Sequence, residues 1–245
     1  MTSPLVVPAT RSAAVVLEAA GVVREYRGGD GALLRVLAGV DLSVRAGEMV
    51  AIVGASGAGK STLLQVLGAL DAATAGTVRI GGRDVPASDD VAMAALRNRS
   101  VGFVFQFHHL LAEFSAVENV AMPLLIAGRA PTEARSRAAA LLAQVGLASR
   151  ASHRPGELSG GEQQRVAVAR ALAVNPAVLL ADEPSGNLDH QTAEQLHDML
   201  ASLVAETGLA LVVVTHNASL AARAHRVLVL ADGVLRPSGR ETEAA

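Results

Sequence analysis

The chain has 245 residues, enough for one large α/β domain with a full core. Hydrophobic residues make up 51 % of it, but no apolar run reaches the length of about 18 residues that a membrane-spanning helix needs. The net charge of −2 argues against a basic surface for nucleic acid. The absence of cysteine excludes disulfides and thiolate metal sites, and the N-terminus lacks the pattern of a secretory signal.

Strand and helix signals alternate along the chain from about Val15. Strands are expected at 15–19 and 33–37, and a buried strand at 49–53 leads into a glycine-rich loop. A helix follows with apolar spacing at 61–70. Further strands are expected at 77–80, 101–105, 177–182, 210–215 and 226–231, with helices at about 190–205 and 218–224.

The region from about 108 to 173 differs, because its apolar spacing is mainly helical. These patterns predict the α/β class, with one mainly parallel core, a helical insert at about 108–173 and a small antiparallel lobe near the N-terminus. The expected limits are a flexible tail at 1–13, one domain at 14–240 and a second tail at 241–245.

The segment GASGAGKST follows a buried strand and precedes a helix, which is the context that a phosphate-binding loop requires. Its glycines let backbone N–H groups crowd around phosphate oxygens, and the helix start adds partial positive charge. Lys60 is expected to reach the β- and γ-phosphates, and Ser61 to ligate magnesium. The segment therefore predicts a site for Mg-ATP formed by Gly54, Ala55, Ser56, Gly57, Ala58, Gly59, Lys60, Ser61 and Thr62.

Two acidic residues end the apolar segment VLLADEP at 178–184. Asp182 is expected to hold magnesium through water, and Glu183 to polarise the attacking water one residue closer to the γ-phosphate. Alone, the pair is equally compatible with two surface acids at a strand end. The phosphate loop upstream favours the catalytic interpretation.

The segment LSGGEQQR at 158–165 resembles the signature of the ATP-binding cassette (ABC) ATPases, and the resemblance extends from about Val15 to about Arg236. It implies an ATP hydrolase that works as a dimer coupled to transport. In that family this segment opens a helix that faces the γ-phosphate held by the opposite subunit. The resemblance therefore assigns an ATP contact to Ser159, Gly160 and Gly161. Ser159 and Glu162 also have the spacing of a capping box, and the two interpretations are compatible.

The resemblance assigns roles to four further residues. Gln106 matches the glutamine that touches magnesium and links the core to the helical insert, and Asp189 in GNLD matches the acid that approaches the partner's phosphate loop. His216 matches the histidine that holds the γ-phosphate, although Asn217 replaces the acid that many relatives carry next. Tyr26 matches the aromatic residue that stacks on adenine, with a partly exposed strand tyrosine as the alternative. The expected catalytic residues are thus Glu183, His216, Lys60 and Gln106, and the expected magnesium ligands are Ser61, Gln106 and Asp182.

The adjacent histidines His108 and His109 raise the question of a second metal site. Adjacent side chains tend to point apart, and no third ligand lies nearby in the sequence. No metal beyond magnesium is therefore expected.

All four phenylalanines lie between 103 and 114. Phe103 and Phe105 alternate on an expected strand, which favours a core role. Phe107 and Phe114 lie beyond it, in a segment suited to a protein interface. In ABC transporters the matching surface receives a short coupling helix from the membrane subunit.

Four segments of the sequence resemble the ATPases of lipoprotein-releasing systems: QFHHLL, ENVAMPLL, HRPGELSGGEQQRVAVARAL and ADEPSGNLD. That resemblance implies two integral membrane permease subunits, a peripheral location at the cytoplasmic face of the inner membrane, and lipoprotein release toward the outer membrane. The ATPases of macrolide exporters (MacB) and of division complexes (FtsE) share most of these motifs and are the nearest alternatives.

Two other classes are less compatible with the sequence. An ABC ATPase acting on nucleic acid or ribosomes usually has a split or doubled cassette, whereas every motif here occurs once. A regulatory cassette without turnover has no need of Lys60, Asp182, Glu183 and His216 together.

Overall fold

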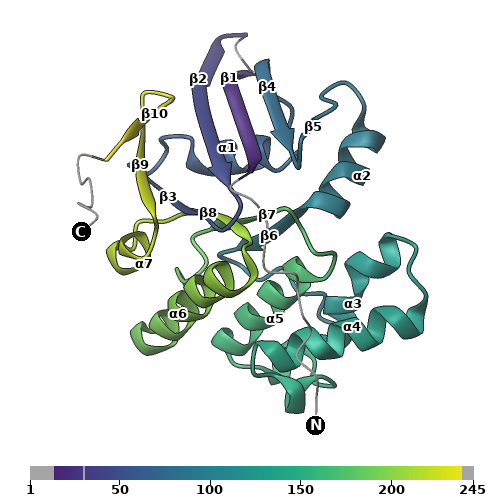
Figure 1. Ribbon diagram of the computed structural model, residues 1–245. Helices are drawn as coiled ribbons and strands as arrows, with labels where there is room; N and C mark the ends of the chain where they lie inside the picture. Colours follow the sequence, from purple (N-terminus) through teal and green to yellow (C-terminus); the bar gives the residue numbers. More distant parts are fainter. Residues whose placement is uncertain (1–13, 30, 239–245) are drawn as a thin grey trace.

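The computed structural model describes residues 14–29 and 31–238, and the two tails expected at 1–13 and 241–245 lie outside this part. Two β-sheets and seven α-helices make up the described chain (Figure 1). No described helix is both long and apolar enough to cross a membrane.

The larger sheet has six strands in the order β10-β9-β3-β8-β7-β6. All neighbours in it pair in parallel except β9 and β10, which form an antiparallel hairpin. Its strands are β3 (Met49–Val53), β6 (Val101–Phe105), β7 (Val178–Asp182), β8 (Ala210–Val214), β9 (Arg226–Ala231) and β10 (Val234–Pro237). The parallel strands end at one edge of the sheet, so the loops that follow them gather there.

The smaller sheet is antiparallel, in the order β2-β1-β4-β5. Its strands are β1 (Val15–Arg27), β2 (Leu33–Arg45), β4 (Ala75–Ile80) and β5 (Arg83–Asp84). The helices are α1 (Lys60–Leu67), α2 (Asp90–Ser100), α3 (Ala116–Ile126), α4 (Pro131–Gln144), α5 (Gly160–Leu172), α6 (His190–Thr207) and α7 (Ala218–Ala222), with short 3₁₀ turns at Ala148–Arg150 and Pro155–Glu157.

The period-two pattern of the buried strands divides the core between the two faces of the large sheet. Val178 and Leu180 of β7 pack with α1 and the antiparallel sheet. Leu179 and Ala181 of the same strand pack with α3, α5 and α6 on the other face. These four side chains are fully buried, which explains why β7 is apolar along its whole length up to Asp182.

The helices α3, α4 and α5 form a group below the large sheet, away from the antiparallel sheet (Figure 1). Asn119 is buried in this group, and its side-chain amide donates to the carbonyls of Leu111, Phe114 and Ser115. It also accepts from the N–H of Leu111. One polar side chain therefore ties the segment after β6 to the start of α3.

The sequence patterns miss the helix α2 and the short strands β5 and β10. The helix α2 begins at Asp90, after the N-cap residue Asp89, whose carboxylate accepts from the N–H of Ala92. The helix buries only Met93 and Leu96. Two buried residues are too few for a clear helical period, although the N-cap aspartate was a usable signal. The strand β10 follows β9 after a two-residue turn at Asp232 and Gly233, both with positive φ, so the Asp-Gly pair was a usable hairpin signal.

Candidate nucleotide site

The loop 54–59 connects β3 to α1 at the carboxyl edge of the parallel sheet. A Cβ at Gly54 would lie 2.5 Å from the carbonyl oxygen of Leu230, so the loop backbone passes β9 too closely for a side chain. Gly59 has a φ of 94°, and a Cβ there would lie 2.7 Å from Cγ1 of Val36. A side chain at either position would clash with a neighbouring strand, so only glycine fits there. The loop backbone therefore packs closely against both sheets.

Lys60 folds back over this loop. Its ammonium donates to the carbonyl oxygens of Gly54 at 2.9 Å and Ala55 at 2.8 Å. The first turn of α1 contains no acidic residue, so the partial positive charge of the helix start is not compensated there. The loop therefore combines a fixed cation with a free helix start, a combination that binds phosphate groups.

Asp182, the last residue of β7, lies near this loop. Burial raises the pKa of its carboxyl group, a hydrogen bond with Ser61 acts in the opposite direction, and the charge of Glu183 raises the pKa further. A desolvated carboxylate beside a hydroxyl offers the oxygen ligands that Mg²⁺ prefers, and a bound cation would relieve the cost of ionising it. The residues present therefore fit magnesium held jointly with phosphate oxygens and water.

Glu183 and His216 are in direct contact. The Nδ1 atom of His216 lies 2.8 Å from one carboxylate oxygen of Glu183, and the His216 backbone N–H donates to the other at 3.2 Å. The Glu183 backbone has a φ of 44°, and its N–H donates to the carbonyl of Val214 at 2.9 Å. The strained backbone and two contacts hold this carboxylate in one orientation at the sheet edge.

Gln106 follows β6 and forms a reciprocal pair with Asn187. The Gln106 amide donates to the Asn187 side-chain oxygen at 3.0 Å, and the Asn187 amide donates to the Gln106 carbonyl at 3.2 Å. A Cβ at Gly186 would lie only 2.9 Å from Nε2 of Gln106. Sequence reasoning missed Asn187 as a partner, and its only signal was a place inside the GNLD motif.

Ser159 caps the start of α5. Its hydroxyl accepts from the N–H of Glu162 at 3.3 Å, and the Glu162 carboxylate accepts from the Ser159 N–H at 2.8 Å, so the expected capping box is confirmed. Gly161 lies against α6, where a Cβ would be 2.3 Å from Cγ2 of Thr192. Asp189 caps α6 by accepting from the Thr192 N–H at 3.0 Å.

The starts of α5 and α6 therefore lie side by side. Among the described residues, neither Ser159 nor Asp189 makes a hydrogen bond to the loop 54–59 of the same chain. Within one chain, the expected site thus consists of two separate groups: the loop with Asp182, Glu183 and His216, and the pair of helix starts.

Tyr26 lies on β1, and its ring has one face covered. The guanidinium carbon of Arg24 is 4.4 Å from the ring centroid, and the hydroxyl donates to Asp71 at 2.8 Å. Arg24 and Asp71 also form an ion pair at 2.7 Å. The ring is therefore fixed in orientation, with a cation on one face.

The adjacent histidines connect the segment after β6 to α5. Arg170 donates to the carbonyls of His109 at 2.6 Å and His108 at 2.8 Å. Burial is the main cause that lowers the pKa of His108, and a contact with the Gly160 backbone opposes it. The His109 ring meets Phe105 edge to face, with centroids 5.4 Å apart.

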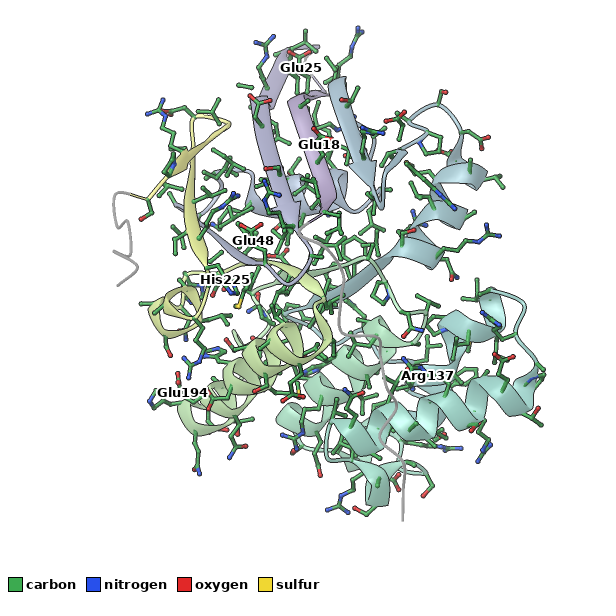
Figure 2. The ribbon with its side chains drawn as sticks, in the orientation of Figure 1. Glu18, Glu25, Glu48, Arg137, Glu194 and His225 are labelled. Carbon is green, nitrogen blue, oxygen red and sulfur yellow. The ribbon has the colours of Figure 1, made fainter. Side chains whose placement is uncertain are left out.

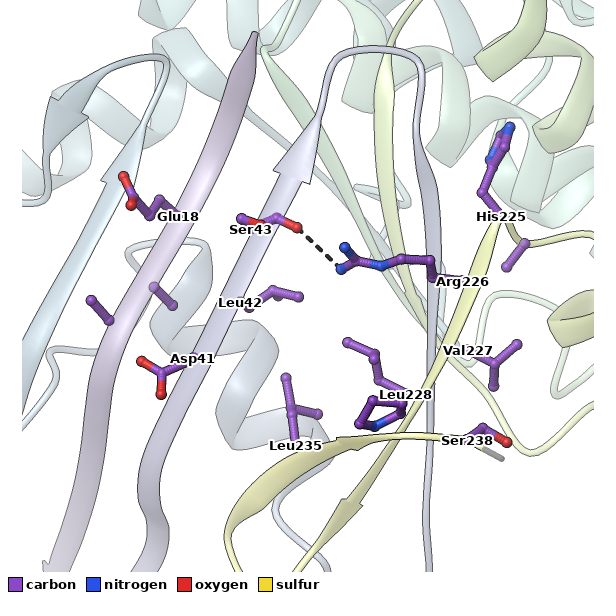
Figure 3. A pocket seen from close by; sticks show the side chains of 14 residues that line it. Glu18, Asp41, Leu42, Ser43, His225, Arg226, Val227, Leu228, Leu235 and Ser238 are labelled. Atoms are coloured by element: carbon purple, nitrogen blue, oxygen red, sulfur yellow. Dashed lines mark hydrogen bonds between the residues drawn. The ribbon is translucent and has the colours of Figure 1, made fainter. Parts of the chain in front are cut away.

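A groove of about 910 Å³ lies between the antiparallel sheet and β9–β10 (Figure 3). Arg226 crosses it and donates to the Ser43 carbonyl at 3.1 Å, and Glu18 and Asp41 line the opposite side. The groove contains none of the expected nucleotide-site residues. The phosphate loop itself lies on the open surface, where Ala55, Ser56 and Gly57 are exposed.

A parallel sheet whose strand ends carry a glycine-rich loop, a lysine and an Asp–Glu pair defines a P-loop nucleoside triphosphatase. The family model for ABC transporters matches residues 37–186. The lipoprotein-releasing system ATP-binding protein LolD of Geobacter metallireducens is 54 % identical over 89 % of this chain and 96 % of its own. The LolD protein of a Ruegeria species is 55 % identical over 90 % of this chain and 97 % of its own.

Two solved ABC cassettes are similar in fold to this chain. A post-hydrolysis dimer of the ATP-binding cassette MJ0796, bound to ADP and phosphate, has a TM-score of 0.81 and 39 % identity over 90 % of this chain and 96 % of that one. CbiO1 from Clostridium perfringens has a TM-score of 0.79 and 26 % identity, over 91 % of this chain and 87 % of that one. The chain therefore belongs to the ABC transporter family, in the group that contains these LolD proteins. It is an ATP-binding ATP hydrolase, and the expected α/β cassette fold is confirmed.

Proposed function

We propose that this ATPase drives the release of lipoproteins from the inner membrane toward the outer membrane. The observation that carries the proposal is the identity of 54 % and 55 % to two lipoprotein-releasing proteins, which covers nearly the whole of each chain. The chain would act as a peripheral protein at the cytoplasmic face of the inner membrane, with two integral permeases of the LolC/LolE kind.

ATP would bind with its phosphates in the loop 54–62 and its adenine on the uncovered face of Tyr26. Lys60 would exchange its two carbonyl contacts for the β- and γ-phosphate oxygens, a stronger charge-assisted pairing. Mg²⁺ would be held by Ser61, Gln106 and Asp182, and when bound it neutralises charge on the phosphates.

Hydrolysis would depend on Glu183 and His216. Glu183 would accept a proton from the attacking water, since its carboxylate is fixed at the sheet edge and is only 18 % exposed. The His216 side chain is 74 % exposed, so it can turn to the γ-phosphate at little desolvation cost. Without ATP, this contact would hold the Glu183 carboxylate and the His216 imidazole together. Bound ATP would separate the two groups.

A second copy of the chain would complete the site. Ser159, Gly160 and Gly161 would present the start of α5 to the γ-phosphate held by the partner, and Asp189 would approach its loop. Two observations support this arrangement: the loop is open to solvent in one chain, and the helix starts form a separate group. The related cassette MJ0796 has been solved as a dimer.

The membrane partners would contact the side of the molecule where β6 meets α3. A groove of about 670 Å³ lies there, lined by Phe103, Phe105, Met122 and Ile126 among others. Phe107 is 65 % exposed and Ile126 is 69 % exposed, so both side chains offer apolar area to a partner. Residues 14–240 would form the cassette, and the region 108–173 would be the helical subdomain that carries this surface.

The experiment that tests the proposal is purification of tagged Glu183→Gln chain from gently solubilised membranes in the presence of ATP. Two permeases together with bound lipoprotein are the expected companions. A single efflux permease or a division-type permease would instead support the MacB-like or FtsE-like alternative. Recovery of nucleic acid or ribosomes, without any permease, would contradict transport. Wild-type chain without ATP is the matched control.

A further inference from the structure

His197 of α6 is fully buried and is not part of the nucleotide site. Its Nε2 atom lies 2.8 Å from the hydroxyl of Ser185, which is also buried. Its Nδ1 atom lies 3.4 Å from a carboxylate oxygen of Glu194, one turn earlier on the helix. Ser185 stands two residues after Glu183, so the imidazole reaches directly into the segment that leads to Asp189.

Glu194 continues the connection to α7 (Figure 2). Its second oxygen lies 2.8 Å from Nη2 of Arg223, and the same nitrogen lies 2.7 Å from Asp198. Arg223 also donates to the carbonyl of Ser219 at 3.0 Å and to its hydroxyl at 2.6 Å. The two carboxylates of Glu194 and Asp198 thus hold α7 against α6, while the bonds from Arg223 to Ser219 lie within the α7 segment.

The helix α7 begins at Ala218, two residues after His216. Asn217 caps it by accepting from the N–H groups of Ser219 at 2.9 Å and Leu220 at 3.1 Å. The segments that carry Glu183 and His216 are therefore joined twice. They meet directly at the sheet edge, and they are connected again below it through Ser185, His197, Glu194 and Arg223.

The charge states of Glu194 and His197 define the direction of the hydrogen bond between His197 and Ser185. Hydrogen bonds from Ser219 and Arg223 lower the pKa of Glu194, so its carboxylate is ionised. Burial lowers the pKa of His197 and outweighs the opposing effect of Glu194, so the ring is neutral. Nε2 then accepts from the Ser185 hydroxyl, and Nδ1 faces the Glu194 carboxylate at 3.4 Å without the alignment of a hydrogen bond.

We propose that His197 is a positioning residue for ATP hydrolysis, because it anchors Ser185 and the segment 183–189 to the Glu194–Arg223 pair behind His216. The inference rests on the proposed roles of Glu183, His216 and Asp189. In the part of the chain that the structure describes, His197 makes no hydrogen bond or ion pair with those three side chains, so its effect acts through Ser185. A small displacement of a catalytic carboxylate is enough to slow a reaction strongly.

The test compares four variants for kcat and KM, with kcat expressed per ATP-binding site so that misfolded chain does not count. His197→Phe removes both polar contacts at similar volume, and we expect kcat to fall by about 3- to 10-fold with KM for ATP within about twofold. His197→Gln keeps an acceptor and a donor and should restore most of the rate. Ser185→Ala should reproduce the loss, and combining it with His197→Phe should add little.

Leu200→Ala is the matched control, because Leu200 is fully buried one turn further along α6 and its side chain has no polar atom. It should lower Tm and leave kcat per site unchanged. If His197→Phe does not fold, Ser185→Ala gives the same test. A normal kcat per site in the folded variants overturns the inference, and so does failure of His197→Gln to recover. Glu183→Gln, measured in parallel, separates the two proposals: its near-normal turnover would refute the assigned catalytic roles whatever His197 does.

Discussion

The side chains of Glu183 and His216 meet because β7 and β8 pair in parallel with Asp182 opposite Val214. This register places the residues just beyond each strand end beside one another at the carboxyl edge of the sheet. The imidazole Nδ1 is 2.8 Å from the carboxylate. The proposed base and the proposed phosphate-binding histidine thus come from two sequence motifs that the sheet brings into contact.

Replacing Glu183 by Gln should separate ATP binding from hydrolysis. The amide oxygen can still accept from the His216 backbone N–H, but the amide cannot take a proton from water, so we expect turnover to fall about 100-fold or more. ATP affinity should stay near the wild-type value and the ATP-bound dimer should accumulate, which size-exclusion chromatography with ATP would detect. Near-normal turnover would remove Glu183 from the catalytic role.

Lys60 is the only lysine in the chain. Lys60→Ala should weaken ATP binding by about 10- to 100-fold, the value of one or two charge-assisted hydrogen bonds, and should reduce turnover as well. Isothermal titration measures the first effect. An unchanged affinity would show that the loop does not bind the phosphates as proposed.

The single lysine also allows a chemical test on the unmodified protein. An amine-specific reagent can label only Lys60 and the chain terminus, and ATP should protect Lys60 from it. Mass spectrometry of the peptide that contains Lys60 reads the protection directly, with AMP as the control because it lacks the β- and γ-phosphates. Equal protection by AMP would contradict the assigned phosphate contact.

Gly161→Ala should push α5 away from α6. The added Cβ would lie 2.3 Å from Cγ2 of Thr192, so the helix starts must separate, at a cost of about 1–3 kcal/mol of the free energy of unfolding. The Thr192→Ser variant lacks that methyl group, and adding it to Gly161→Ala should restore both Tm and ATPase activity. A double variant as damaged as Gly161→Ala alone would show that the clash is not the cause.

Asp182 should make the stability of the metal-free protein depend on pH. Burial raises its pKa above the ordinary 3.8, so the folded state holds this proton more tightly than the unfolded state. The free energy of unfolding therefore falls as pH rises from 3.8 through the raised value, and the loss persists at neutral pH.

Asp182→Asn cannot ionise and should have a higher Tm than wild type at neutral pH without metal. The difference should shrink as pH falls below the raised pKa, and thermal unfolding curves across that range would measure it. Glu113→Gln, at an exposed position, controls for the loss of one negative charge. A lower Tm for Asp182→Asn at neutral pH would contradict the assigned burial cost.

Local sequence patterns were enough to predict much of the candidate nucleotide site. The glycine loop with Lys60 and the Asp–Glu pair lie at or just beyond the ends of buried strands. Such strand ends can be recognised from a run of apolar residues within one segment. The helix α2 escaped notice because it buries only two side chains on a weakly apolar face. Periodicity detects an element only when enough of its residues are buried.

The sequence by itself therefore determined the class of protein and the residues around the phosphate loop, because those motifs are contiguous and each has a local conformational reason. Only the tertiary structure decided which distant residues meet. Gln106 pairs with Asn187, Gly161 lies against Thr192, and His197 reaches Ser185. These contacts depend on sheet register and helix packing, which arise from the burial of the whole core and are not encoded in any single segment.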